Sequence, residues 1–141
     1  MSRSILVAHD GSSHAQAALE YALEMFPDTR LVVFHAIDPF ELTPDEDRLP
    51  PLTEDWLAEQ HDEAATLFAD ALEAVDTEGV VIETETAVGS PAQTIVAAVE
   101  ETGVDGIVIG SRGRGNVAEA RMGSTAELVV KRASVPVTVV R

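Results

Sequence analysis

The chain has 141 residues, of which 45% are hydrophobic and only 4% aromatic, and this size and composition predict one globular domain over residues 1–141. Without a cysteine, the chain has no disulfide, zinc ribbon or thiol chemistry. Its formal net charge of −16 disfavours nucleic acid and anionic membranes as partners and is typical of halophilic proteins, with an ordinary acidic protein as the alternative.

No apolar run approaches the length that spans a membrane, and the first residues run into a short strand signal without a signal-peptide pattern. We therefore expect a cytoplasmic protein.

The first part of the chain predicts a strand, a helix and a second strand. The apolar run 5–8 is typical of a strand buried on both faces, and it ends in a turn at Gly11. Apolar residues then recur at helical spacing up to Phe26, and Ser13 with Gln16 matches a capping box. A second buried strand is expected over 31–34.

Prolines and acidic residues dominate the segment from about Asp38 to Thr53, which indicates a long loop or lid. A helical stripe follows between Glu54 and Asp76, and a strand is expected over 80–88. The next helix should begin at Ser90-Pro91-Ala92-Gln93, which combines an N-cap, a proline at the first helical position and a capping-box glutamine.

The last part of the chain predicts a fourth strand over 106–109, a glycine- and arginine-rich loop over about 110–123, and a helix that carries Ala126, Val129 and Val130. A fifth strand over 135–140 completes the pattern.

Five strands alternating with helices predict an α/β fold, a single doubly wound, Rossmann-like parallel sheet with helices on both faces. The strand order 3-2-1-4-5 would make the first and fourth strands neighbours, with their following helices on opposite sides. Ligands of such folds bind in the crevice at that switch point. Functional residues are therefore expected after Ala8 and after Ile109.

The loop after the fourth strand concentrates positive charge in an acidic chain, with Arg112, Arg114 and Arg121 ahead of a helix N-terminus. Its glycines, Gly110, Gly113 and Gly123, would let the backbone approach phosphate oxygens closely. The amides of Gly123, Ser124 and Thr125 would then form an anion site strengthened by the helix dipole. The alternative is a surface loop with solvated arginines.

The spacing Gly110-x-x-Gly113-x9-Gly123-Ser124 resembles the nucleotide motif of the ATP-binding branch of the universal stress protein family. The resemblance extends along the chain, through Asp10-Gly11-Ser12, His35-Ala36-Ile37-Asp38, Gly89-Ser90-Pro91 and the terminal Val135 to Val140.

The resemblance implies an ATP site. Asp10 matches an acidic residue near the nucleotide, the ribose or a metal, and Ala8 and Ala36 match positions beside adenosine and adenine. The implied phosphate and ribose contacts are Gly110, Gly113, Gly123, Ser124 and Thr125. Arg112 stands at a site position where the family usually has a histidine or an arginine. Asp10 is also a candidate to hold Mg²⁺ that bridges the phosphates, with a helix N-cap as its alternative role.

The function expected from these features is that of a nucleotide-dependent stress-response regulator that binds ATP, ADP or AMP and is not a fast enzyme. A slow ATPase or phosphotransferase that uses Asp10 and Mg²⁺ is one alternative. A ligand-free dimerisation module is another.

A homodimer is expected through the uncharged edge strand from Val135 to Val140, and the resemblance implies the same interface.

Other nucleotide and hydrolase motifs are absent from the sequence: it contains no P-loop, no Gly-x-Gly-x-x-Gly after the first strand and no Gly-x-Ser-x-Gly. A receiver domain would need an acceptor aspartate after the third strand, where this chain has Gly89-Ser90. The four histidines, His9, His14, His35 and His61, have no metal-binding spacing on a helix.

Overall fold

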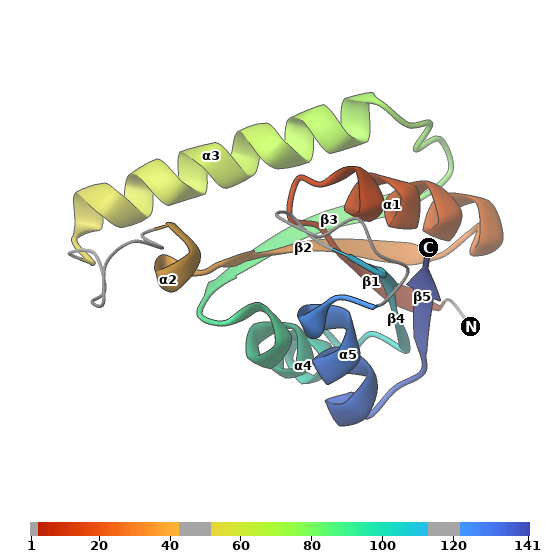
Figure 1. The fold of residues 1–141 in the computed structure, drawn as a ribbon. Helices are drawn as coiled ribbons and strands as arrows, with labels where there is room; N and C mark the ends of the chain where they lie inside the picture. Colours follow the sequence, from red (N-terminus) through yellow and green to blue (C-terminus); the bar gives the residue numbers. More distant parts are fainter. Residues whose placement is uncertain (1–2, 43–51, 113–121) are drawn as a thin grey trace.

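The computed structural model describes residues 3–42, 52–112 and 122–141. Its sheet has five parallel strands in the order β3-β2-β1-β4-β5, which confirms the predicted order (Figure 1). The strands are β1 (Ser4–Ala8), β2 (Arg30–Ile37), β3 (Val81–Val88), β4 (Gly106–Gly110) and β5 (Val137–Val140). β1 is the central strand and pairs with both β2 and β4.

Helices cover both faces of the sheet, as Figure 1 shows, because each central strand is apolar on both sides. Helices α1 (Ser13–Met25) and α3 (Glu54–Glu73) lie over one face, where they pack on Ile5 and Val7 of β1. Helices α4 (Pro91–Thr102) and α5 (Ser124–Arg132) lie over the other face and pack on Leu6. None of the helices in the described ranges is long and apolar enough to cross a membrane.

The helix starts differ in detail from the predicted caps. Ser12, not Ser13, is the N-cap of α1, because its Oγ accepts a hydrogen bond from the Ala15 amide at 3.1 Å. Ser90 is the N-cap of α4 and Pro91 its first residue, as predicted, but the Ser90 hydroxyl makes no capping hydrogen bond. The capping box with Gln93 is therefore not formed as predicted.

The proline-rich segment that was predicted as a loop or lid begins with a short helix, α2 (Pro39–Leu42). Residues 43–51 lie outside the described part of the chain. The structure therefore corrects the predicted loop or lid at residues 39–42 only, where it has a helix.

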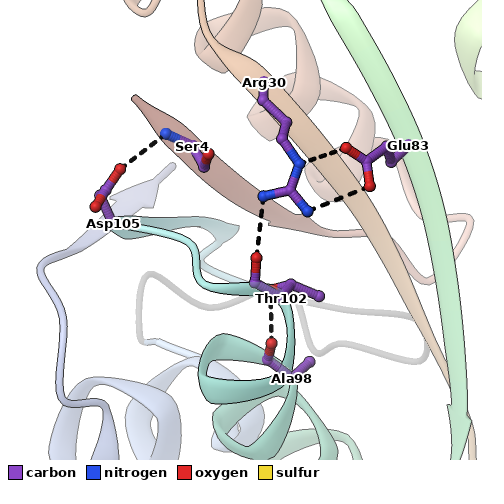
Figure 2. Close-up of polar contacts among 6 residues, drawn as sticks. All are labelled: Ser4, Arg30, Glu83, Ala98, Thr102 and Asp105. Atoms are coloured by element: carbon purple, nitrogen blue, oxygen red, sulfur yellow. Dashed lines mark hydrogen bonds and ion pairs between the residues drawn. The ribbon is translucent and has the colours of Figure 1, made fainter. Parts of the chain in front are cut away.

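A polar cluster ties three elements together at the amino ends of the strands (Figure 2). The Arg30 guanidinium donates to both carboxylate oxygens of Glu83 on β3 and, through Nη1, to the Thr102 carbonyl at 3.0 Å. Because Thr102 is the last residue of α4, this cation lies at the negative end of a helix dipole. The hydrogen bond from Arg30 also lowers the pKa of the Glu83 carboxyl below its usual value.

Candidate functional site

A cavity of about 980 Å³ opens at the carboxyl ends of the strands, where β1 and β4 lie side by side. Its size falls in the range of small-molecule sites. Chain direction explains its place: β1 leads into α1 on one face, whereas β4 leads towards α5 on the other, so the two connections diverge. The site residues predicted from the sequence that line it are Ala8, Asp10, Ala36, Gly110, Arg112, Gly123, Ser124 and Thr125. The ninth, Gly113, lies outside the described residues, as do Arg114 and Arg121.

One wall of the cavity is apolar and rigid. Phe34, Ile95 and Ile109 all line it and are all nearly fully buried, so they are held by the core beneath α4. Pro91 and Ala92 at the start of α4 extend the same wall. Such a surface suits a flat, weakly polar group that gains stability by leaving water.

Charged groups of both signs line the cavity. Asp10 and Asp38 follow β1 and β2, whereas Arg112 follows β4. The N-terminus of α5 lies on the Arg112 side, and its N-cap is Gly123, which has no side chain to cap the helix. The amides of Ser124 and Thr125 therefore have no partner within the helix and can bind an anion.

Two glycines of this region make structural contacts that the sequence did not predict. The Gly123 amide is not free, because it donates to the Ser111 carbonyl at 2.5 Å and so holds the start of α5 beside the end of β4. A Cβ on Gly110 would lie 2.7 Å from the backbone oxygen of His14. The missing side chain of Gly110 is therefore needed for the close approach of α1, and the predicted contact of Gly110 with phosphate stays a prediction.

The turn from Asp10 to Ser12 forms the wall on the β1 side. The Asp10 Oδ1 accepts a hydrogen bond from the Ser12 amide at 2.9 Å, and Gly11 has a positive φ of 87° that favours glycine. Since Ser12 caps α1, the alternative role of Asp10 as helix N-cap is wrong.

His9 lines the cavity directly behind this turn and is only 4% exposed. Its ring contacts the Gly11 amide through Nδ1 (3.0 Å) and the Gln16 side chain through Nε2 (2.8 Å). Burial lowers the pKa of His9 below its usual value, against an opposing effect of its hydrogen bond to Gln16. The ring is therefore neutral near pH 7.

Several lining residues were not predicted from the sequence: Asp38, Ser90, Gln93, Ser111, Leu128 and Arg132. Asp38 and Ser90 follow the carboxyl ends of β2 and β3, so the rule that ligands bind at this edge could have found them. Arg132 is the last residue of α5, and no sequence signal marks it as a lining residue. Within the described ranges, no group of three or more His, Asp or Glu residues is arranged to hold a metal ion.

Comparison with known proteins assigns the chain to one family. The family model of the universal stress protein family matches residues 1–141. A universal stress protein of Thermus aquaticus is 35% identical over 146 residues, covering 100% of both chains. MJ0577 is a universal stress protein of Methanocaldococcus jannaschii. Its solved structure aligns with this one with a TM-score of 0.83 at 28% identity, covering 99% of this chain and 96% of that one.

Three further solved structures share the fold at lower identity and are described with adenine nucleotides. They are a universal stress protein in complex with cAMP (20% identity, TM-score 0.71), one from Archaeoglobus fulgidus in complex with dAMP (22%, 0.67) and one from Arabidopsis thaliana with AMP bound (20%, 0.66). Each alignment covers at least 98% of this chain and 90% of the other.

Proposed function

Since this chain belongs to the universal stress protein family, we propose that it binds an adenine nucleotide, ATP in the first place, in the cleft between β1 and β4. The observation that carries the proposal is the cleft itself, which joins an apolar wall to an uncapped helix N-terminus at the switch point of the sheet. Its chemistry matches an amphipathic ligand with a flat base at one end and phosphates at the other. The structures of family members with cAMP, dAMP and AMP support the same ligand class.

In this proposal each part of the cleft contacts one part of the nucleotide. Adenine packs on the apolar wall beside Ala8 and Ala36, and the phosphates accept hydrogen bonds from the Ser124 and Thr125 amides, with Arg112 nearby. Asp10 faces the ribose or a Mg²⁺ ion held by the phosphates, since Mg²⁺ takes one or two carboxylates together with phosphate and water.

The proposed role is that of a cytoplasmic, nucleotide-dependent stress-response regulator that acts as a homodimer in concentrated salt. The uncharged β5 edge supports the dimer, and the net charge of −16 supports adaptation to salt.

The proposal is tested by adding a negative charge where the phosphates should lie. Ser124→Glu places a carboxylate at the first residue of α5. There its negative charge interacts favourably with the helix dipole and so stabilises the helix, but it repels phosphate. We expect ATP affinity to fall by about tenfold or more in calorimetry, with adenosine much less affected. Ala97→Glu is the matched control, because Ala97 is exposed on α4 and does not line the cavity.

Equal losses of ATP affinity in both variants would contradict the phosphate site. No binding of ATP, ADP or AMP to the folded wild-type protein at millimolar concentration would contradict nucleotide binding altogether. The dimerisation-module alternative would then take its place.

The nature of the nucleotide and the role of Asp10 need two further measurements. Mass analysis of small molecules released from denatured protein identifies what the protein carries when purified. Titration of Asp10→Asn with and without Mg²⁺ tests the metal: a Mg²⁺ dependence seen in the wild type should disappear in the variant. Metal-dependent turnover that the same variant abolishes would favour the slow ATPase.

A further inference from the structure

His9 makes hydrogen bonds to four residues that lie in three parts of the fold: strand β2, the turn at Gly11 and helix α1. Its amide donates to the Phe34 carbonyl on β2 at 2.8 Å, and its carbonyl accepts from Nδ1 of His35 at 2.9 Å. Its ring contacts the Gly11 amide on one side and the Gln16 side chain of α1 on the other. Gln16 in turn donates from Nε2 to the Ala71 carbonyl of α3 at 3.0 Å. The ring thus connects the turn at the cleft to both helices on that face of the sheet.

The hydrogen-bond partners of His9 determine which of its two ring nitrogens carries the proton. An amide N–H can only donate, so Nδ1 must accept from Gly11 and carries no proton. The carbonyl of Ala71 can only accept, so the Gln16 amide nitrogen points to it and Oε1 faces the ring. Nε2 of His9 must then carry the proton and donate to Oε1.

The bond to Gly11 holds the turn that carries Asp10. Gly11 has a left-handed φ of 87°, and the Ser12 amide that follows it donates to the Asp10 carboxylate. The orientation of the turn therefore determines where the Asp10 carboxylate lies at the cavity wall. A turn already held in place avoids the entropy cost of ordering it when a ligand binds.

We propose that His9 is a positioning residue of the cleft: through Nδ1, its neutral ring holds the Gly11 amide and so presents Asp10 to the bound nucleotide. This inference rests on the proposed nucleotide site. The inference assigns a different role to each ring nitrogen. Nδ1 acts on the ligand through the turn, whereas Nε2 helps to join helices α1 and α3 through Gln16.

Two substitutions separate these two roles. The Oδ1 of asparagine can take the place of Nδ1, so His9→Asn keeps an acceptor for the Gly11 amide and loses the bond to Gln16. The Nε2 of glutamine can take the place of the ring Nε2, so His9→Gln keeps the donor to Gln16 and loses the acceptor. Each variant keeps one of the two ring bonds, which makes them matched controls for stability.

The expected result is that His9→Asn binds ATP within about threefold of the wild type, whereas His9→Gln binds about fivefold more weakly or worse. Gln16→Met keeps the hydrogen bond from the Gly11 amide to His9, so this variant should bind ATP as tightly as His9→Asn does. It provides the test if His9→Asn does not fold. Equal affinities in His9→Asn and His9→Gln, or a loss in Gln16→Met as large as in His9→Gln, would overturn the inference while nucleotide binding stands.

A spectroscopic measurement tests the ring without a ligand. In a ¹⁵N-labelled protein, two-bond correlations from the ring protons distinguish a nitrogen with a proton from one without. We expect Nδ1 of His9 to be unprotonated, and a proton on Nδ1 would overturn the inference. Failure of the wild type to bind any adenine nucleotide would instead remove the proposed function on which the inference rests.

Discussion

Arg30 and Glu83 connect β2 to β3 at the end of the sheet opposite the cleft. Because Arg30 lowers the pKa of Glu83, the folded state binds a proton at this carboxyl less readily than the unfolded state does. The pair therefore contributes stability above the unfolded pKa of about 4.5, and this contribution is lost as the pH falls from there through the lower folded pKa.

We expect Glu83→Gln to remove that part of the pH dependence. The difference in the free energy of unfolding between wild type and variant should be largest at neutral pH and shrink below about pH 4.5, measured by urea unfolding along a pH series. Glu20→Gln, an exposed carboxylate on α1, is the control. A difference that stays constant with pH would argue against the pair.

Gly110 and Gly106 stand at the two ends of β4 and should tolerate alanine very differently. A Cβ on Gly110 would lie 2.7 Å from the His14 backbone oxygen, which cannot rotate away. On Gly106 the nearest atom is Cδ1 of Ile5 at 3.3 Å, the end of a flexible side chain. Gly110→Ala should destabilise the protein by about 1–3 kcal/mol and Gly106→Ala by clearly less, in thermal or urea unfolding. Similar losses would contradict the close approach of α1 to β4.

Most of the elements could be predicted from local pattern, because each one follows a single physical rule. Strands buried on both faces are continuous apolar runs, and helices on a sheet carry an apolar stripe. The exact helix starts are less predictable: Ser12 and Ser13 are both capping residues, and only the backbone geometry shows that the Ser12 hydroxyl reaches the Ala15 amide. The short α2 lacks the length for any periodic signal.

The site could be predicted where it depends on the chain direction and not where it depends on packing. Asp10, Arg112 and Ser124 lie at strand ends or a helix start, which the strand order brings together. The bonds of His9 to Gln16 and of Gly123 to Ser111 arise from contacts between helices, strands and loops, and neither leaves a pattern in the sequence.

One edge of the β5 strand pairs with β4, and no strand in the described part of the chain pairs with its other edge, which is the proposed dimer interface. The carbonyls of Pro136 and Val140 accept from β4, so the backbone groups of Val139 point the other way. Val139→Pro should therefore remove an outward N–H while leaving the pairing with β4 intact.

We expect Val139→Pro to sediment as a monomer and to keep its circular dichroism spectrum. Val88→Pro, at the end of the opposite edge strand β3, is the control and should leave the wild-type association state unchanged. Dimers that persist in Val139→Pro would place the interface elsewhere.

At the scale of the whole molecule, carboxylates outnumber basic groups by 25 to nine, and helix α3 shows how they are arranged. Its outer face carries exposed acidic residues with no lysine or arginine between them: Glu54, Asp55, Glu59, Asp62, Glu63, Asp70 and Glu73. Like charges spaced along one helix face repel, and salt weakens this repulsion.

The melting temperature should therefore rise with KCl, most steeply up to about 1 M, where the Debye length has fallen to roughly 3 Å. Differential scanning calorimetry over this range provides the measurement. A neutral osmolyte such as sucrose is the control for effects other than screening, and a melting temperature that is flat or falls with KCl would contradict the halophilic interpretation.

The central place of β1 also affects how the chain reaches this structure during synthesis. β1 is made before the other four strands of the sheet, yet one of its two neighbours is β4, and a hydrogen bond at this boundary joins Ser4 to Asp105, 101 residues apart. Until β4 has left the ribosome, the apolar residues of β1 have an unpaired edge that other nascent chains can join. The pairing of the strand that leads into the cleft is thus completed late, and the emerging amino-terminal half of the chain stays open to association with other chains until β4 is made.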